Sequence, residues 1–109
     1  MKLDMNALMK QAQQMQEQMV RAQEEAKNEI AEASAGGGMV TVKANGAGEL
    51  LEIAIDPRAI DPDDPELLSD LVLAAVNEAL RSSRALMESK MSGLMPGGLG
   101  DLGGLLPGA

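Results

Sequence analysis

The sequence predicts an α+β fold in which two long helices flank a β-hairpin. Three observations predict it: an apolar heptad stripe over residues 4–28, strand alternation on both sides of an Asn-Gly turn at residues 45–46, and helical periodicity from residue 65 onward. The chain has 109 residues, which is the size of one small domain.

The first predicted helix covers residues 4 to about 28. Its apolar positions recur at alternating spacings of three and four residues, at Met5, Leu8, Ala12, Met15, Met19, Ala22 and Ala26. Asp4 precedes the stripe and is a suitable N-cap. Because Met and Ala are weak seam residues for a free-standing coiled coil, we expect an amphipathic helix that packs on its own domain.

Residues 29–34 are compatible with a last helical turn or with a short alternating strand. Gly36, Gly37 and Gly38 end either element. A glycine run can also cradle phosphate, but no Lys-Ser or Lys-Thr pair follows it here. We therefore interpret the three glycines as a turn.

A β-hairpin follows. Residues 39–44 alternate and place Val40 and Val42 on one face, and the returning strand over residues 49–55 places Leu51, Ile53 and Ile55 on one face. The residues between the strands, Asn-Gly-Ala-Gly, are turn formers because Asn and Gly accept positive φ.

The second helix is predicted from Pro65 to about residue 91. Asp64 is its expected N-cap, and Glu66 meets the positive end of the helix dipole. The acidic residues of the preceding connection also suggest a calcium site, but the spacing and glycine of an EF-hand are missing. From residue 93 the chain becomes a tail rich in Gly, Pro, Leu and Met, and its composition predicts disorder.

The composition excludes most catalytic chemistry. The chain contains no Cys, His, Trp, Tyr or Phe, so the usual zinc ligands and the Ser-His-Asp and Cys-His arrangements are missing. We expect a protein that is not an enzyme and that uses no cofactor, metal or small-molecule substrate. The longest apolar run covers residues 71–76, which is too short for a membrane span and favours a cytoplasmic protein.

The missing aromatic residues also bear on assembly. A chain of this size buries only about 60–65% of its unfolded surface, so a core of Ala, Val, Leu and Met is marginal for a monomer. We therefore expect a homodimer.

Charge is distributed unevenly. The net charge is −8, and residues 24–75 hold 12 of the 17 acidic side chains but only three of the nine basic ones. The start of the first helix and the end of the second are mildly basic, and an antiparallel helix pair would bring them side by side. If the protein binds a polyanion, we expect the contacts to come from the basic side chains of these two segments: Lys2, Lys10, Arg21, Arg81, Arg84 and Lys90.

Three segments, in this order, resemble the YbaB/EbfC family of bacterial nucleoid-associated proteins. They are LMKQAQQMQEQM at residues 8–19, GGGMVTVKANGAGELLEIAIDP at residues 36–57, and DPDDPELLSDLVLAAVNEAL at residues 61–80. The resemblance implies a two-layer fold of a helix, a three-stranded antiparallel sheet and a helix, with the first strand near residues 30–35. It would form one YbaB-like domain over residues 1–92, followed by the tail at 93–109.

The resemblance also implies function. It suggests a homodimer with protruding helical arms that binds double-stranded DNA with low sequence specificity, alters its conformation and organises the nucleoid, with effects on gene expression. The alternative is a non-enzymatic adaptor that binds recombination or replication proteins through its Met-rich face and its tail. The net charge of −8 favours this alternative, and exposed Met suits adaptable interfaces.

Overall fold

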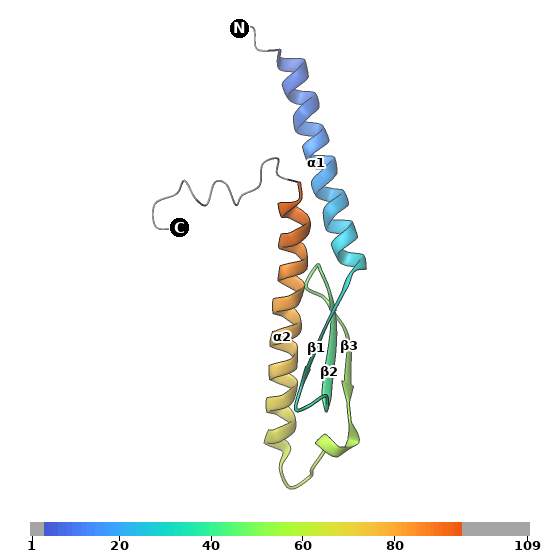
Figure 1. Ribbon diagram of the computed structural model, residues 1–109, viewed down its shortest axis with the longest axis vertical. Helices are drawn as coiled ribbons and strands as arrows, with labels where there is room; N and C mark the ends of the chain where they lie inside the picture. The colour runs from blue at the N-terminus through green and yellow to red at the C-terminus, as the bar shows by residue number, and fades with distance from the viewer. Residues whose placement is uncertain (1–3, 95–109) are drawn as a thin grey trace, which may run out of the picture.

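The computed structural model of the protein describes residues 4–94. Along the chain, the elements are α1 (Met5–Asn28), β1 (Ile30–Ala35), β2 (Val40–Asn45), β3 (Leu50–Ile55), the short 3₁₀ helix η1 (Pro57–Ala59) and α2 (Pro65–Ser92). Figure 1 shows an elongated molecule in which α2 lies beside a small sheet, while α1 runs in the opposite direction and extends beyond the end of the sheet. The helix–three strands–helix order expected from the resemblance is confirmed.

α1 begins and ends where the sequence predicts. The side chain of Asp4 accepts hydrogen bonds from the backbone N–H groups of Asn6 (3.0 Å) and Ala7 (3.4 Å), which satisfies two of the donors at the helix start. At the other end the N–H of Glu29 donates to the carbonyl of Ala26, and Glu29 is extended. The chain then enters β1, so residues 30–35 form a strand and not a last helical turn.

The sheet has the order β1-β2-β3, and both strand pairs are antiparallel. Val42 lies at its centre, paired with Ala33 on one side and Ile53 on the other. The three glycines form the turn between β1 and β2, and all three have positive φ, between 65° and 94°. A side chain in this backbone conformation is strained, which explains the glycine run without a phosphate.

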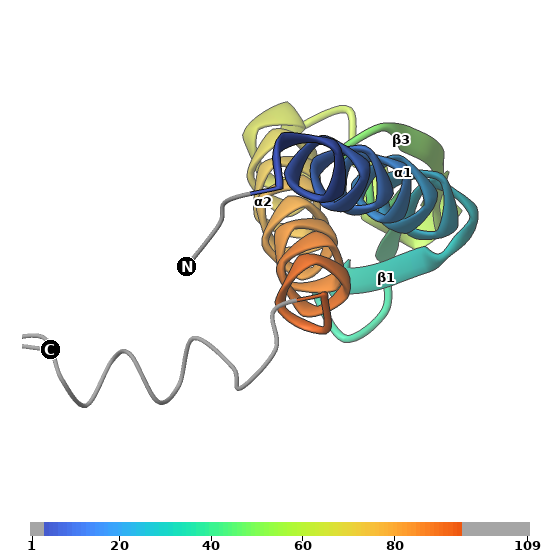
Figure 2. The same ribbon diagram turned by 90° about the horizontal axis from the view of Figure 1, so that it is seen from above.

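α2 begins with the predicted cap. Asp64 accepts from the N–H of Leu67, Pro65 occupies the first turn, and Glu66 adds an acidic side chain there. The helix packs on β1 and β2, which gives the second layer, and its last turns also contact α1. Seen along the long axis in Figure 2, α2 lies beside the sheet and α1 passes across the end of the molecule.

The core between α2 and the sheet is small. It consists of Ala33, Val40, Val42, Ala44, Ala75 and Ala79, with partly buried Leu and Val side chains around it. The largest side chains that are fully buried are those of Val40, Val42 and Ser83. The monomer therefore encloses Ala and Val, while larger apolar side chains stay at its surface.

The expectation that the whole first helix packs on its own domain is wrong. Only Ala22 and Ala26 of α1 are buried, and every residue from 5 to 21 is exposed. Figure 1 shows why: α1 continues well past the end of α2, so nothing in the described chain lies beside its first half. We call residues 5–19 the projecting part of α1. Its stripe includes Met5, which is 67% exposed, and Met15, which is 47% exposed.

The inner face of β3 is also uncovered. Leu51, Ile53 and Ile55 are exposed although their strand pairs with the buried β2. α2 lies over β1 and β2 and leaves the β3 side open. We call these three residues the β3 face. The tail expected at 93–109 lies outside the described residues from 95 onward, and Gly93 is the C-cap of α2.

Candidate nucleic-acid interface

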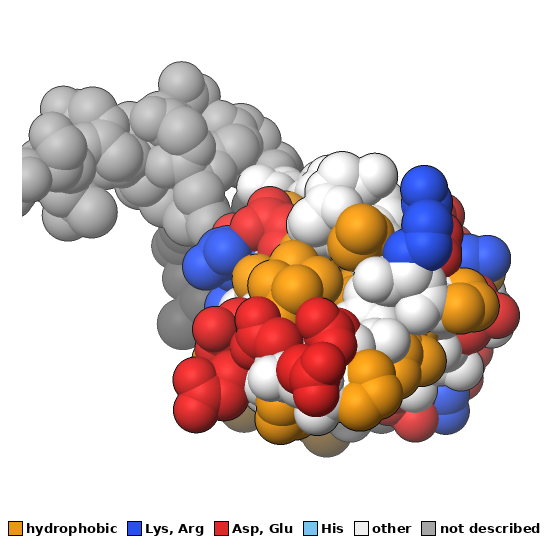
Figure 3. All heavy atoms as spheres, turned by 90° about the horizontal axis from the view of Figure 1, so that it is seen from below, with side chains coloured by type: hydrophobic (Ala, Val, Ile, Leu, Met, Phe, Trp, Pro, Cys, Tyr) orange, Lys and Arg blue, Asp and Glu red, His pale blue; other side chains and the backbone are white. Residues whose placement is uncertain are grey.

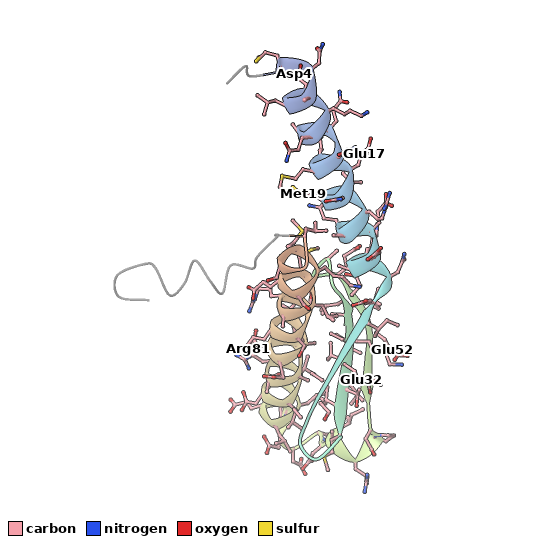
Figure 4. The ribbon with its side chains drawn as sticks, turned by 45° about the horizontal axis from the view of Figure 1, so that its top comes forward. Asp4, Glu17, Met19, Glu32, Glu52 and Arg81 are labelled. Atoms are coloured by element: carbon pink, nitrogen blue, oxygen red, sulfur yellow. The ribbon has the colours of Figure 1, made fainter. Side chains whose placement is uncertain are left out.

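The predicted DNA-contacting residues are distributed over both helices. Lys10 is on the projecting part of α1, Arg21 is where α1 reaches the end of α2, and the remaining described ones, Arg81, Arg84 and Lys90, are on the second half of α2. Lys2 lies outside the described residues. Figure 4 shows Arg81 on the side of α2 that points away from the sheet.

The structure brings two of these residues together. Arg21 and Lys90 line one hollow between α1 and the end of α2, together with Ala22 and Leu94. Lys10 precedes Arg21 by eleven positions on the same helix, so it lies about 16 Å farther along the axis. The predicted cations therefore follow the two helices as a line and do not form one cluster.

The cations also differ in their partners. The guanidinium of Arg81 donates to Glu78 Oε2 at 2.6 Å, and Lys90 Nζ lies 2.7 Å from Glu29 Oε1 and 3.6 Å from Glu25 Oε2. By contrast, no carboxylate of residues 4–94 comes within 4.0 Å of the charged groups of Lys10, Arg21 or Arg84. These three are therefore available for phosphate without losing an internal partner.

Lys90 is held in place by the carboxylates. Its side chain is 31% exposed, and the hydrogen bond to Glu29 raises the pKa of its ammonium, with smaller contributions from the charges of Glu29 and Glu25. It is positively charged at neutral pH, but two acidic side chains already neutralise it. A phosphate would have to compete with both.

The helix end at this site is anchored by residues that sequence reasoning did not identify. The N–H of Gly46 donates to the carbonyl of Ala26 at 2.8 Å, and a Cβ at position 46 would lie 2.5 Å from that oxygen. The buried hydroxyl of Ser83 donates to the carbonyl of Asn45 at 2.6 Å. A serine inside an apolar helical stripe is the signal that indicates such a bond.

The backbone of the turn between β2 and β3 differs from the prediction that its Asn and Gly residues adopt positive φ. Of the turn residues, only Gly48 has positive φ, at 84°. Asn45 instead shapes the turn with its side chain, whose Oδ1 accepts from the N–H groups of Ala47 and Glu49, both at 3.0 Å. Gly46 is needed because α1 lies too close for a side chain.

Acidic side chains dominate the opposite end of the molecule. Figure 3 looks at the end that holds the connection from η1 to α2 and shows carboxylates gathered among apolar side chains. Asp61 and Asp63 of this connection and Glu66 of the first turn of α2 are exposed. Within residues 4–94, no three acidic side chains converge on a point that could hold a metal ion. This end would repel the phosphates of DNA.

The sequence profile of the YbaB/EbfC DNA-binding family matches residues 1–99. The chain belongs to the YbaB/EbfC DNA-binding family. The match includes both helices and the whole sheet, so it covers every element described above. The resemblance inferred from the three sequence segments is thereby confirmed.

The names of similar proteins agree with this assignment. A nucleoid-associated protein of Acetivibrio thermocellus is 53% identical over 102 residues, which cover 94% of this chain and 89% of that protein. One of Saccharopolyspora erythraea is 50% identical over 109 residues, covering 96% of this chain and 93% of that protein. These names favour the DNA-binding function over the adaptor alternative.

A solved structure has the same fold. The crystal structure of an uncharacterized protein from Helicobacter pylori matches with a TM-score of 0.71 and 26% identity, over 81% of this chain and 92% of that chain. The α+β class and its two-layer arrangement are thus those of a YbaB-like protein. Within residues 4–94 of the chain described here, neither α1 nor α2 is long and apolar enough to cross a bilayer.

Proposed function

We propose that this protein is a nucleoid-associated protein that binds double-stranded DNA as a homodimer, with low sequence specificity. The observation that carries the proposal is the family match over residues 1–99. In this proposal the protein is not an enzyme. It acts in the nucleoid of the cytoplasm, where it alters the conformation of DNA, organises the nucleoid and influences gene expression.

The charge distribution supports contact through the helices. Lys10, Arg21 and Arg84 project from α1 and α2 without an internal carboxylate partner among residues 4–94. Because the sheet end is acidic, DNA is attracted only where these cations outweigh the repulsion. We propose that Lys2, Arg81 and Lys90 contribute to the same positive line, Arg81 and Lys90 less strongly because carboxylates already hold them.

Low specificity follows from the kind of contact. Lys and Arg on exposed helix surfaces reach phosphates, which position the protein but carry no sequence information. The chain has no aromatic side chain to insert between or stack on bases. Affinity would then come mainly from counterion release and would fall steeply with salt.

The homodimer is supported by the size of the apolar side chains, which are small in the core and larger on the surface. The core holds nothing larger than Val and Ser among its fully buried side chains, whereas Leu51 and Ile53 are 53% and 44% exposed. A second copy seated on the β3 face would bury these side chains and supply the apolar area that one chain lacks. The projecting parts of α1 would then form the two arms of the dimer.

Sedimentation tests the dimer. At micromolar concentration we expect twice the chain mass of 11.4 kDa. Ile53→Glu places a charge on the β3 face and should dissociate the dimer, while Ala54→Glu, on the opposite face of the same strand, should not. A folded monomer for the unmodified protein, or equal dissociation by both variants, would contradict the proposal.

A gel shift over a salt series tests DNA binding. If a dimer neutralises about four phosphates, the log–log slope of affinity against salt is about −3.6, which weakens binding about a hundredfold between about 50 and 200 mM salt. Duplexes of different sequence and equal length should bind with similar affinity. The absence of binding at the lowest salt would overturn the proposal and favour the adaptor alternative.

A further inference from the structure

Lys90 joins three parts of the molecule. It belongs to the last turn of α2, and its ammonium lies 3.6 Å from Glu25 of α1 and 2.7 Å from Glu29, the residue between α1 and β1. We call this arrangement the Lys90 bridge. It connects the end of one helix to the end of the other at the place where α1 leaves the sheet.

The Lys90 bridge lies where the projecting part of α1 leaves the rest of the molecule, so a small tilt of α1 there gives a large displacement at its N-terminal end. Every residue in the projecting part of α1 is exposed, and its first turns extend beyond all other described elements (Figure 1). From Glu25 to Met5 the helix spans 20 positions, or about 30 Å, so a tilt of about 10° at the base moves the tip by about 5 Å. A DNA phosphate contact at Lys10 depends on shifts of this size.

Other contacts fix where α1 is attached, but they do not oppose tilting equally. Ala26 and Gly46 hold the helix through close packing at the turn after β2, and Ala22 is buried on the side of the hollow that it shares with the end of α2. The Lys90 bridge adds a charged connection on the side of α1 that faces α2, where the hollow lined by Arg21 and Leu94 leaves the two helix ends less closely packed. A pair of charges with one partner more than half exposed is weakened by salt.

We propose that Lys90 is a positioning residue, which sets the direction of the projecting part of α1 through Glu25 and Glu29. It thus determines where Lys10 and Arg21 present their charges to DNA. This inference rests on the proposed function, and it changes the role of Lys90 from a predicted phosphate contact to a support for other contacts.

Removal of the two carboxylate charges should change DNA affinity in opposite directions, depending on whether the bridge positions α1 or the charges act only by repelling DNA. Glu25→Gln/Glu29→Gln removes negative charge beside the DNA-binding line. Electrostatics alone would tighten DNA binding, whereas loss of the bridge should weaken it, by about two- to fivefold for partly exposed pairs. Glu17→Gln/Glu24→Gln is the matched control on the same helix, because neither residue has a cation within 4.0 Å in the described chain, and it should tighten binding.

A measurement without DNA separates this inference from the proposed function. The chain has no cysteine, so Gln11→Cys and Asn77→Cys can carry two spin labels, one on the projecting part of α1 and one on α2. Labelled protein diluted with excess unlabelled protein reports distances within one chain. Lys90→Gln should broaden the distance distribution, and Lys90→Arg should restore it.

Each outcome decides the proposal. A broadened distribution with Lys90→Gln, restored by Lys90→Arg, together with weaker DNA binding by Glu25→Gln/Glu29→Gln, supports it. An unchanged distribution overturns the positioning role, even if the protein binds DNA. Tighter binding by Glu25→Gln/Glu29→Gln, as in the control, overturns the link to DNA. If the unmodified protein does not bind DNA, the spin-label result still shows whether the bridge sets the helix direction.

Discussion

The two halves of α1 share one apolar stripe but have opposite environments. In the second half, Ala22 and Ala26 are 5% and 0% exposed, and the backbone of Gly46 lies directly against Ala26. In the first half, Met5 and Met15 occupy equivalent positions and are 67% and 47% exposed. The periodic pattern therefore predicts the helix, while burial depends on whether another element is present beside it.

The two halves of α1 also differ in the size of the side chains in their apolar stripe. Small residues occur where α1 meets the turn after β2, because backbone approaches backbone there. Met and Leu occur where α1 projects, as Figure 4 shows for Met19, which lies on the side of α1 toward the end of α2. We expect the first kind of position to tolerate almost no change and the second to tolerate many.

The largest expected effect is at the anchored half. Gly46→Ala places a Cβ 2.5 Å from the Ala26 carbonyl oxygen, and the backbone must shift, which should lower the free energy of unfolding by about 3 kcal/mol. Gly93→Ala is the control, since its Cβ meets nothing closer than 3.6 Å. Urea denaturation measures both. Similar stability of the two variants would mean that α1 is not held through this contact.

Substitutions in the core and in the projecting part of α1 should differ clearly in how much they lower the free energy of unfolding. Val42→Ala removes two buried methyl groups from a fully buried side chain and should cost about 2 kcal/mol. Met15→Ala removes more apolar surface from an exposed position, and should change stability by less than about 0.5 kcal/mol. A loss at Met15 as large as that at Val42 would show that the stripe is covered in the folded protein.

Ser83→Ala tests the bond between α2 and the turn. The hydroxyl is buried and donates to the Asn45 carbonyl, which also accepts from the N–H of Gly48 at 3.1 Å. Its removal takes away one of two donors to this carbonyl and should cost about 1 kcal/mol in the free energy of unfolding. Ser89→Ala, at an exposed position on the same helix, should be close to neutral. If thermal denaturation ranks the two in reverse, the bond does not contribute to stability.

The smallest effect concerns the acidic end of the molecule. The hydrogen bonds from the Arg58 side chain and backbone lower the pKa of Asp56 from 3.8 to about 2. The contribution of this pair to stability is therefore present above pH 3.8 and is lost as the pH falls through about 2. Arg58→Gln should raise the pKa of Asp56 in an NMR titration, and Lys43→Gln should leave it unchanged.

Much of the fold could be predicted because its signals are local. The bounds of α1, the caps at Asp4 and Asp64, and the buried face of Val40 and Val42 all follow from short-range patterns. β1 could not be assigned from its own residues, since IAEASA suits both a helix and a strand. There the resemblance to the family supplied the answer.

The candidate site was less predictable because it depends on contacts between distant residues. Lys90 and its partner Glu29 are separated by 61 positions, and nothing near Lys90 in the sequence indicates that it is neutralised. Gly46 looked like a turn residue, but the approach of Ala26 is what requires glycine. Charge along the sequence predicts the helices as the DNA-binding region, and only the structure separates cations that have a carboxylate partner from those without one among residues 4–94.

In the proposed function, the helices bind DNA and the sheet does not. A gel shift should compare Arg21→Glu/Arg84→Glu on the helices with Lys43→Glu/Arg58→Glu on the sheet side, which involves the same change in net charge. Both variants are first shown to fold and to sediment as the unmodified protein does. We predict that the helix variant binds at least about tenfold more weakly and flattens a salt slope of about −3.6 towards zero, while the sheet variant stays within about twofold. Equal weakening by the two variants would contradict the account.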